Sequence, residues 1–300
     1  MLFKEKVKFI IPDIPKGYKA HPFSIGNEFT MPKKLVSILD DNGFNFREYT
    51  NSFIVPPQAY LKHWFGRRFV PWQALLFNKK EIVYVMDSLI LDKRGTAKKM
   101  SAENLIYLKL KLCLLYGKLD IVCSNGKDAN QIEVEYNTTA HRILKPNLER
   151  FLKASWYEKK ELANNEDIHN KLKKIPIKYR NGVYIYVLQK GEVLLDLIYI
   201  PRLVRKIGFI KINLSSDILF AITDRQLVIL EDDISSINSY TWLLTYIPIN
   251  NINNISFRKQ NRITEITLRI KRNNLLKKLL LNIENKYSQD VKRFLEVLVK

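Results

Sequence analysis

Histidine and cysteine, the side chains that most often act as general bases, nucleophiles or metal ligands, are few in this chain. There are four histidines and two cysteines, and no two histidines have the H-E-x-x-H spacing that places both imidazoles on one helix face. Cys113 and Cys123 lie in apolar stretches, where a buried and unreactive thiol is expected. No glycine-rich phosphate-binding loop and no G-x-S-x-G nucleophile motif occurs. We therefore expect a protein that is not an enzyme and that binds no metal or cofactor.

One short segment, residues 202–211 (RLVRKIGFIK), combines positive charge with large apolar side chains. Its basic residues could contact lipid phosphates, each contributing about 1 kcal/mol at an anionic membrane, while its apolar residues enter the boundary of the acyl chains. Alternatively, the apolar residues continue a strand into the core and the charges form a solvated rim, which is the interpretation that the segment by itself favours. The candidate lipid- or phosphate-binding residues are Arg202, Arg205, Lys206 and Lys211, and the candidate membrane-contacting residues are Ile207, Phe209 and Ile210.

A second segment, residues 62–72 (KHWFGRRFVPW), interleaves aromatic and basic side chains. Aromatic rings beside arginines suit the stacking of nucleic acid bases and the binding of phosphates. They equally suit a buried strand with two arginines on the surface, and we favour this second interpretation.

The formal charge of +20 comes from 50 lysines and arginines against 30 aspartates and glutamates. The excess is spread over the chain after residue 60 and is not gathered in a basic arm. The chain is also rich in Ile, Lys and Asn, as expected of an AT-rich coding sequence, so part of the charge can be compositional. Nucleic acid is therefore an alternative partner, and a less favoured one.

No uncharged apolar run reaches the length of a membrane-spanning helix, about 18 residues, and the N-terminus lacks the pattern of a secretory signal. We expect a cytoplasmic protein that can lie peripherally at a membrane.

Alternation of apolar and polar residues predicts β-strands over most of the chain after residue 72. The strands come in two series, and each series ends in a helix with one apolar face. Residues 263–270 alternate most clearly, and residues 89–91 and 183–188 are also predicted to be strands. The two helical stripes are Leu144, Leu148, Phe151 and Leu152, and Val291, Phe294, Leu295 and Leu298. Each stripe is expected to be buried against the strands that precede it.

These patterns divide the chain into four parts. Residues 1–60, rich in proline, are predicted to form an N-terminal extension, and residues 61–154 a first β-rich domain. Residues 155–181, which are polar, are predicted to form a helical linker. Residues 182–300 are predicted to form a second β-rich domain similar to the first.

Two motifs of the second domain resemble those of bacterial pleckstrin-homology-like (PH-like) domains: Ile222-Thr223-Asp224-Arg225-Gln226-Leu227 and Tyr246-Ile247-Pro248-Ile249-Asn250-Asn251-Ile252. In the first domain, Met86-Asp87-Ser88-Leu89 is a weaker match that lacks the arginine. The resemblance implies an α+β, mainly β fold with two partly open barrels of about seven strands each, both capped by a C-terminal helix.

The resemblance also implies a non-catalytic binding or scaffold function. The implied partner is another protein, a second copy of the chain, or an anionic membrane surface. PH domains that bind phosphoinositides carry their basic residues between the first and second strands, which is where residues 202–211 fall in the second domain. The K-x(n)-[KR]-x-R pattern of those domains is not present in this chain.

Overall fold

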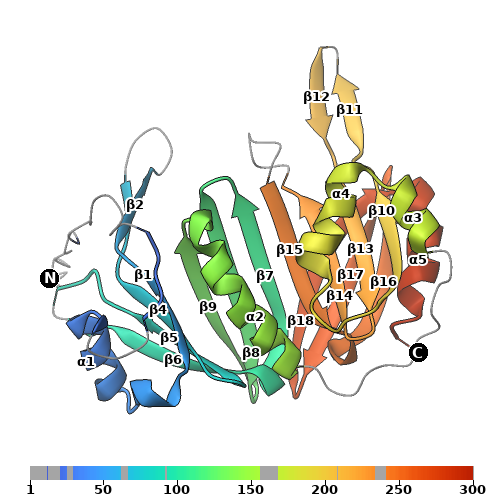
Figure 1. Ribbon diagram of the computed structural model, residues 1–300. Coiled ribbons are helices and arrows are strands. Elements are labelled where there is room, and N and C mark those ends of the chain that lie inside the picture. Colours follow the sequence, from blue (N-terminus) through green and yellow to red (C-terminus); the bar gives the residue numbers. More distant parts are fainter. Residues whose placement is uncertain are drawn as a thin grey trace, which may run out of the picture. The chain divides into compact units, whose positions relative to one another are not determined.

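The computed structural model describes residues 12, 21–25, 30–61, 67–91, 93–155, 168–207, 209–233 and 241–299. The described chain is mainly β, with several antiparallel sheets and a C-terminal helix, as the alternating pattern predicted (Figure 1). It divides into two compact units. The first unit is Met1–Ala102 with Val134–Ala154, and the second is Glu103–Glu133 with Ser155–Lys300.

A four-stranded antiparallel sheet lies at the centre of the first unit. Its order is β1 (Asn51–Val55), β4 (Gln73–Phe77), β5 (Glu81–Met86) and β6 (Thr96–Ser101). Helix α1 (Lys33–Asp41) packs on one face through Leu35, Ile38 and Leu39. Both α1 and β1 belong to the segment predicted as an N-terminal extension, and β1 pairs with β4 along its whole length.

Helix α2 (His141–Ser155) buries the apolar stripe predicted for it. Leu148 is 4% exposed and Phe151 is 1% exposed. Just before the helix, Tyr136 meets Phe53 of β1 edge to face, with ring centroids 5.5 Å apart. An aromatic pair of this geometry contributes about 0.5–1.5 kcal/mol beyond the burial of its area.

The second unit contains a sheet of seven strands. Its order is β10 (Leu194–Ile200), β13 (Ile218–Thr223), β14 (Gln226–Asp232), β15 (Thr241–Pro248), β7 (Leu105–Cys113), β8 (Tyr116–Asn125) and β9 (Asp128–Tyr136), the last residues of β9 belonging to the first unit. β15 joins β7 in antiparallel register from Thr241 opposite Cys113 to Tyr246 opposite Leu108. Strands far apart in sequence are thus neighbours, which local patterning cannot predict.

A separate three-stranded sheet and helix α5 (Ser288–Glu296) complete the core of the second unit. The strands are β16 (Ile252–Gln260), β17 (Ile263–Arg272) and β18 (Leu275–Glu284). Alternate residues of β17, among them Ile266 and Leu268, share one apolar cluster with Phe220 of β13 and with α5. Phe294 is 8% exposed and Leu298 is 2% exposed, so the second predicted helical stripe is also buried.

The order of elements occurs twice along the chain. The first repeat is β1, a β2–β3 hairpin, β4–β6, β7–β9 and α2; the second repeat is β10, a β11–β12 hairpin, β13–β15, β16–β18 and α5. In both repeats the strand before the inserted hairpin pairs with the strand after it. The inserted hairpins are β2 (Gln58–Leu61) with β3 (Arg67–Val70), and β11 (Val204–Ile207) with β12 (Ile210–Asn213).

Two of the predicted strands are wrong. Residues 183–188 continue helix α4 (Ile177–Gly182) as one π-helical turn, η6 (Val183–Val187). Tyr179, Val183 and Val187 lie four residues apart and are all buried, so the period is helical although the residue types favour strands. A Cβ atom on Gly182 would lie 2.7 Å from a methyl group of Leu230, so the helix packs closely on β14.

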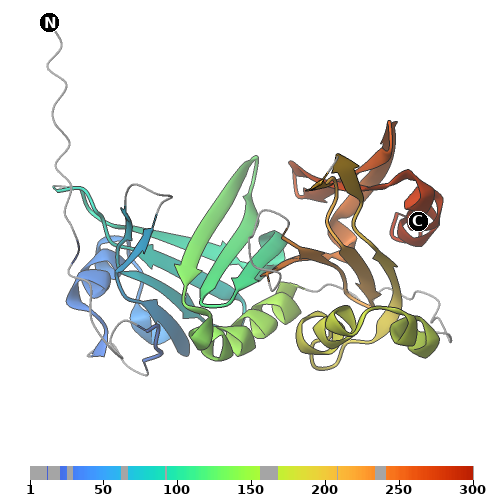
Figure 2. The same ribbon diagram turned by 90° about the horizontal axis from the view of Figure 1, so that it is seen from above.

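Residues 89–91 lie in the connection between β5 and β6, not in a strand of their own. In the predicted linker, α3 (Ile168–Lys174) and α4 are helical, and residues 156–167 lie outside the described part. α3 and α4 lie on one side of the sheet that contains β10 and β13–β15, and α5 lies on the other (Figure 2).

Candidate functional site

The motif residues 222–227 form the turn between β13 and β14, where they hold neighbouring segments in place. The Thr223 hydroxyl accepts hydrogen bonds from the backbone N–H groups of Arg225 at 3.2 Å and Gln226 at 3.0 Å. The carboxylate of Asp224 accepts the N–H of Val193 at 2.9 Å. Because Thr223 and Asp224 are buried, their hydrogen bonds stabilise the fold, and only Arg225 of the motif is partly exposed.

Glu192 belongs to the same hydrogen-bond network, and its pKa is shifted by this environment. Its carboxylate accepts the Thr223 hydroxyl at 3.1 Å and the N–H of Gln189 at 2.9 Å. Burial disfavours the charged form and raises the pKa of Glu192 to about 7, against the opposing effect of these hydrogen bonds.

The candidate residues 202–211 lie in and just before the β11–β12 hairpin, which projects away from the sheets of the second unit (Figure 1). The register pairs Lys206 with Lys211 and Ile207 with Ile210. At the base of the hairpin, the N–H of Leu214 donates to the Leu203 carbonyl at 2.7 Å, and the N–H of Leu203 donates to the Ser215 hydroxyl at 2.9 Å. These bonds fix where the hairpin leaves the sheet.

Arg202 lies at the root of this hairpin and is bound to two buried carboxylates. Its guanidinium donates to Asp217 at 2.5 Å and to Asp232 at 3.0 Å. The Tyr199 hydroxyl also donates to Asp217, at 2.7 Å, and Lys178 forms an ion pair with Asp232. Although 40% of the Arg202 side chain is exposed, its guanidinium is already paired with carboxylates of the protein, so Arg202 anchors the hairpin.

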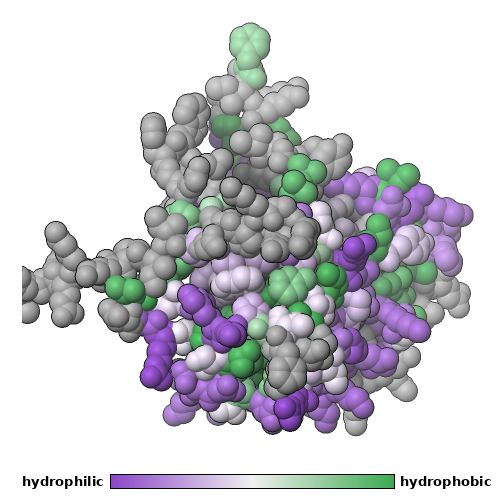
Figure 3. Space-filling view, turned by 60° about the vertical axis from the view of Figure 1, so that its left-hand side comes forward, coloured by the Kyte–Doolittle hydropathy of each residue, from purple (hydrophilic) through white to green (hydrophobic). Residues whose placement is uncertain are grey.

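At the tip of the hairpin, Phe209 is fully exposed to solvent. Val204 and Ile212 on the two strands are 38% and 42% exposed, and Arg205 is exposed as well. Phe209 therefore does not continue a strand into the core, which was the alternative interpretation of this segment. Figure 3 shows hydrophobic atoms at the end of the segment that projects upward. The backbones of Lys206, Ile207, Ile210 and Lys211 lie in the two strands, and their side chains are outside the described set.

The aromatic and basic segment 62–72 falls on the other inserted hairpin, β2–β3. Residues 62–66 lie outside the described residues. Arg68 forms an ion pair with the buried Glu135 at 2.8 Å, and Trp72 packs against the cluster formed by α1 and the first sheet. The described residues of this segment, 67–72, therefore agree with the interpretation as a strand that carries two arginines.

No protein-family model matches this chain. A search of curated proteins gives no match either. No helix in the described part is long and apolar enough to cross a membrane. In the same residues, no group of three or more His, Cys, Asp or Glu side chains could hold a metal ion. Geometry and charge therefore carry the assignment of function.

Sequence reasoning missed the two carboxylates that bind Arg202. Asp217 lies 15 residues after Arg202 and Asp232 lies 30 residues after it, and only the antiparallel return of β13 and β14 brings them together. The available signal was an acidic residue at each end of a predicted hairpin whose strands are mostly apolar.

Proposed function

We propose that this chain is a non-catalytic binding protein with two PH-like domains, which attaches to anionic membrane surfaces through the β11–β12 hairpin. The observation that carries the proposal is a fully exposed phenylalanine at the end of a projecting hairpin that contains three basic residues. Those residues are Arg205, Lys206 and Lys211. Arg202, which binds Asp217 and Asp232, is left out of the contact set.

The order of elements supports two PH-like domains. Each repeat has four strands in one series, three in the next and a closing helix. In the second repeat, α5 packs into the apolar cluster shared by both sheets, as a helix that covers the mouth of a partly open barrel would. The inserted hairpin then lies between the first and second strands of the domain.

The expected binding is weak and reversible. Three basic residues contribute about 1 kcal/mol each at an anionic surface, and burial of one phenylalanine side chain contributes about 1.5–3 kcal/mol. Together these correspond to a dissociation constant of roughly 0.05–0.5 mM. Such a module would act together with a second contact, as membrane attachment generally needs two signals.

Vesicle co-sedimentation tests the proposal. The protein is incubated at low salt with vesicles of phosphatidylcholine alone or with added phosphatidylserine, and only the anionic vesicles are expected to sediment it. Phe209→Ser should weaken this binding about tenfold or more, because the apolar contribution is lost. Leu115→Ser is the matched control, since Leu115 is also a large exposed apolar residue on a turn, that of β7 and β8.

Two results would overturn the proposal. One is no sedimentation with anionic vesicles at low salt. The other is equal weakening by Phe209→Ser and Leu115→Ser. Retention of duplex DNA or RNA that falls steeply with salt, without lipid binding, would favour the nucleic acid alternative.

A further inference from the structure

Strand β10 lies at the end of the seven-stranded sheet and pairs with β13 on one side only. The N–H of Leu197 donates to the side chain of Asp196 at 2.8 Å, which places this N–H on the side of β10 away from β13. Main-chain groups alternate in direction along an antiparallel strand, so Leu197 and Tyr199 direct theirs toward the open edge. An edge of this kind accepts a further strand unless it is blocked.

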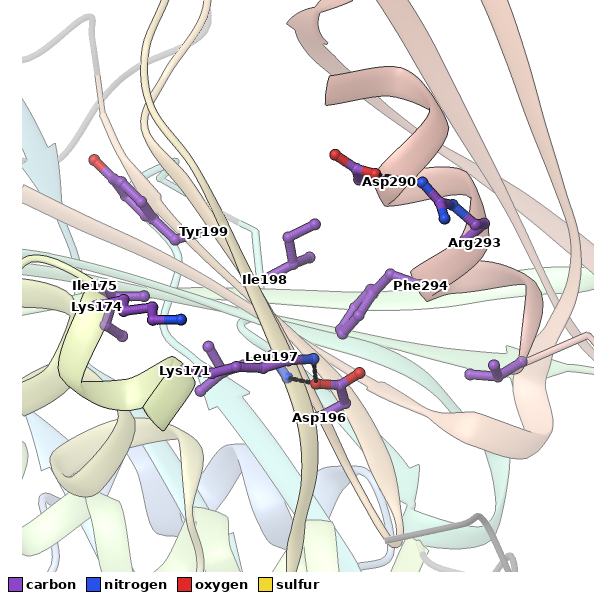
Figure 4. A pocket seen from close by; sticks show the side chains of 11 residues that line it. Lys171, Lys174, Ile175, Asp196, Leu197, Ile198, Tyr199, Asp290, Arg293 and Phe294 are labelled. Carbon is purple, nitrogen blue, oxygen red and sulfur yellow. Dashed lines mark hydrogen bonds and ion pairs between the residues drawn. The ribbon is translucent and has the colours of Figure 1, made fainter. Parts of the chain in front are cut away.

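A groove of about 570 Å³ runs along this edge. Its walls are the α3 segment on one side and α5 on the other, with β10 between them (Figure 4). The volume lies in the range of ordinary ligand sites, about 300–1,000 Å³. One side chain partly closes it: Lys171 of α3 donates to the same Asp196 oxygen that accepts the Leu197 N–H, at 2.5 Å.

The two walls of the groove differ in chemistry. The α3 wall carries Lys171 and Lys174, and α3 as a whole contains three lysines and no acidic residue. Lys174 is exposed and forms no ion pair within the described residues. On the side of α5 the groove is lined by the apolar side chains of Phe294, Val297 and the β10 residue Ile198. Arg293 and Asp290 of α5 also line it and form an ion pair with each other at 2.8 Å. Figure 4 shows Tyr199 and Ile198 pointing to opposite sides of β10.

We propose that this groove binds an extended segment of a partner protein, which adds to β10 as a further strand and alternates acidic with apolar residues. The side chains of a strand alternate between two faces with a period of two. An added strand would therefore direct one set toward Lys174 and the other toward Ile198 and Phe294. Main-chain hydrogen bonds supply affinity in this mode, and the two walls supply specificity. The surface is separate from the β11–β12 hairpin, so the proposal does not depend on membrane binding.

The probe is a fluorescent peptide in which glutamate and valine alternate, with a peptide of the same composition but clustered glutamates as its control. The full chain should bind the alternating peptide saturably and more tightly than the clustered one, as measured by fluorescence anisotropy. Lys174→Glu should weaken binding about tenfold. Lys173→Glu is the matched control, because Lys173 is exposed on the same helix and does not line the groove.

Hydrogen exchange provides a second measurement. Bound peptide should slow the exchange of the Leu197 and Tyr199 amides and leave those of β16–β18 unchanged. Absence of saturable binding, or equal weakening by the two lysine variants, would overturn the proposal. Protection of the same amides by increasing protein concentration alone, with formation of a dimer, would assign the groove to a second copy of the chain instead.

Discussion

The two inserted hairpins occupy the same place in the order of elements, but the arginine that ties each hairpin to the protein is held differently. In the first repeat, Arg68 of β3 forms an ion pair with the buried Glu135, and more than half of its side chain is exposed. In the second repeat, Arg202 bridges two buried carboxylates, which also bind Tyr199 and Lys178. An arginine in or next to an inserted hairpin can therefore be held by carboxylates of the protein itself. In the β11–β12 hairpin, the basic residues after Arg202 are the better candidates for contact with a partner.

The largest expected effect is that of Arg202→Ala. The variant removes the charged hydrogen bonds that Arg202 donates to Asp217 and Asp232, each of which contributes about 1.5–3 kcal/mol. Because 40% of the Arg202 side chain is exposed and the two carboxylates keep Tyr199 and Lys178, we expect a total loss of about 3–4 kcal/mol. Urea unfolding should show this loss in the free energy of unfolding. A variant that keeps wild-type stability but loses vesicle binding would instead show that Arg202 contacts lipid.

One buried titratable group in each repeat should also change the stability of the protein with pH, and the two groups should act in opposite directions. In the second repeat, the pKa of Glu192 is raised from 4.5 to about 7 by burial. The protonated carboxyl of Glu192 therefore stabilises the folded state by about 3 kcal/mol below pH 4.5, and this stabilisation is lost as the pH rises through 7. Unfolding experiments between pH 5 and pH 8 should show a smaller decline for Glu192→Gln than for the wild type. An equal decline in both proteins would exclude Glu192 as the cause.

In the first repeat, burial lowers the pKa of His141 from 6.5 to about 4, and its Nδ1 lies 3.1 Å from the Tyr136 hydroxyl. The neutral imidazole is favoured in the folded state, so stability is full above pH 6.5 and falls by about 3 kcal/mol as the pH drops through 4. His141→Gln should remove most of this acid sensitivity, as followed by unfolding at pH 4 and pH 7. Unchanged sensitivity in the variant would show that other groups cause it.

The smallest expected effect is that of Arg68→Ala, at about 1–2 kcal/mol, because the Arg68 side chain is largely exposed and its partner is a single carboxylate. Measuring this variant and Arg202→Ala by the same urea titration tests the comparison directly. A loss for Arg68→Ala as large as that for Arg202→Ala would remove the difference between the two arginines.

The periodicity of apolar residues correctly predicted the elements in which neighbouring residues alone determine which side is buried. The stripes that contain Phe151 and Phe294 are buried as expected, and the alternation over residues 263–270 became β17. The prediction failed where tertiary contact decides. Residues 183–187 are helical although their residue types favour a strand, and Gly182 lets this helix pack closely on Leu230. The pairing of β15 with β7 joins residues too distant in sequence for any local pattern to predict.

For the candidate site, the sequence located the hairpin but not the role of each basic residue. Nothing in the amino-acid sequence distinguishes the role of Arg202 from that of Arg205. They differ because the return of β13 and β14 brings Asp217 and Asp232 to Arg202. The exposure of Phe209 was likewise undecided by the sequence, since an apolar residue in a strand pattern faces either the core or the solvent.

Depth-dependent quenching of tryptophan at the hairpin tip tests the central claim most directly. Phe209→Trp is mixed with phosphatidylserine-containing vesicles whose lipids carry bromine on the acyl chains, and the wild type with its four native tryptophans provides the baseline. Insertion of the tip predicts a loss of fluorescence in the variant well beyond that of the wild type. This loss should be absent with phosphatidylcholine alone. Identical quenching curves for the two proteins would contradict membrane docking by the β11–β12 hairpin.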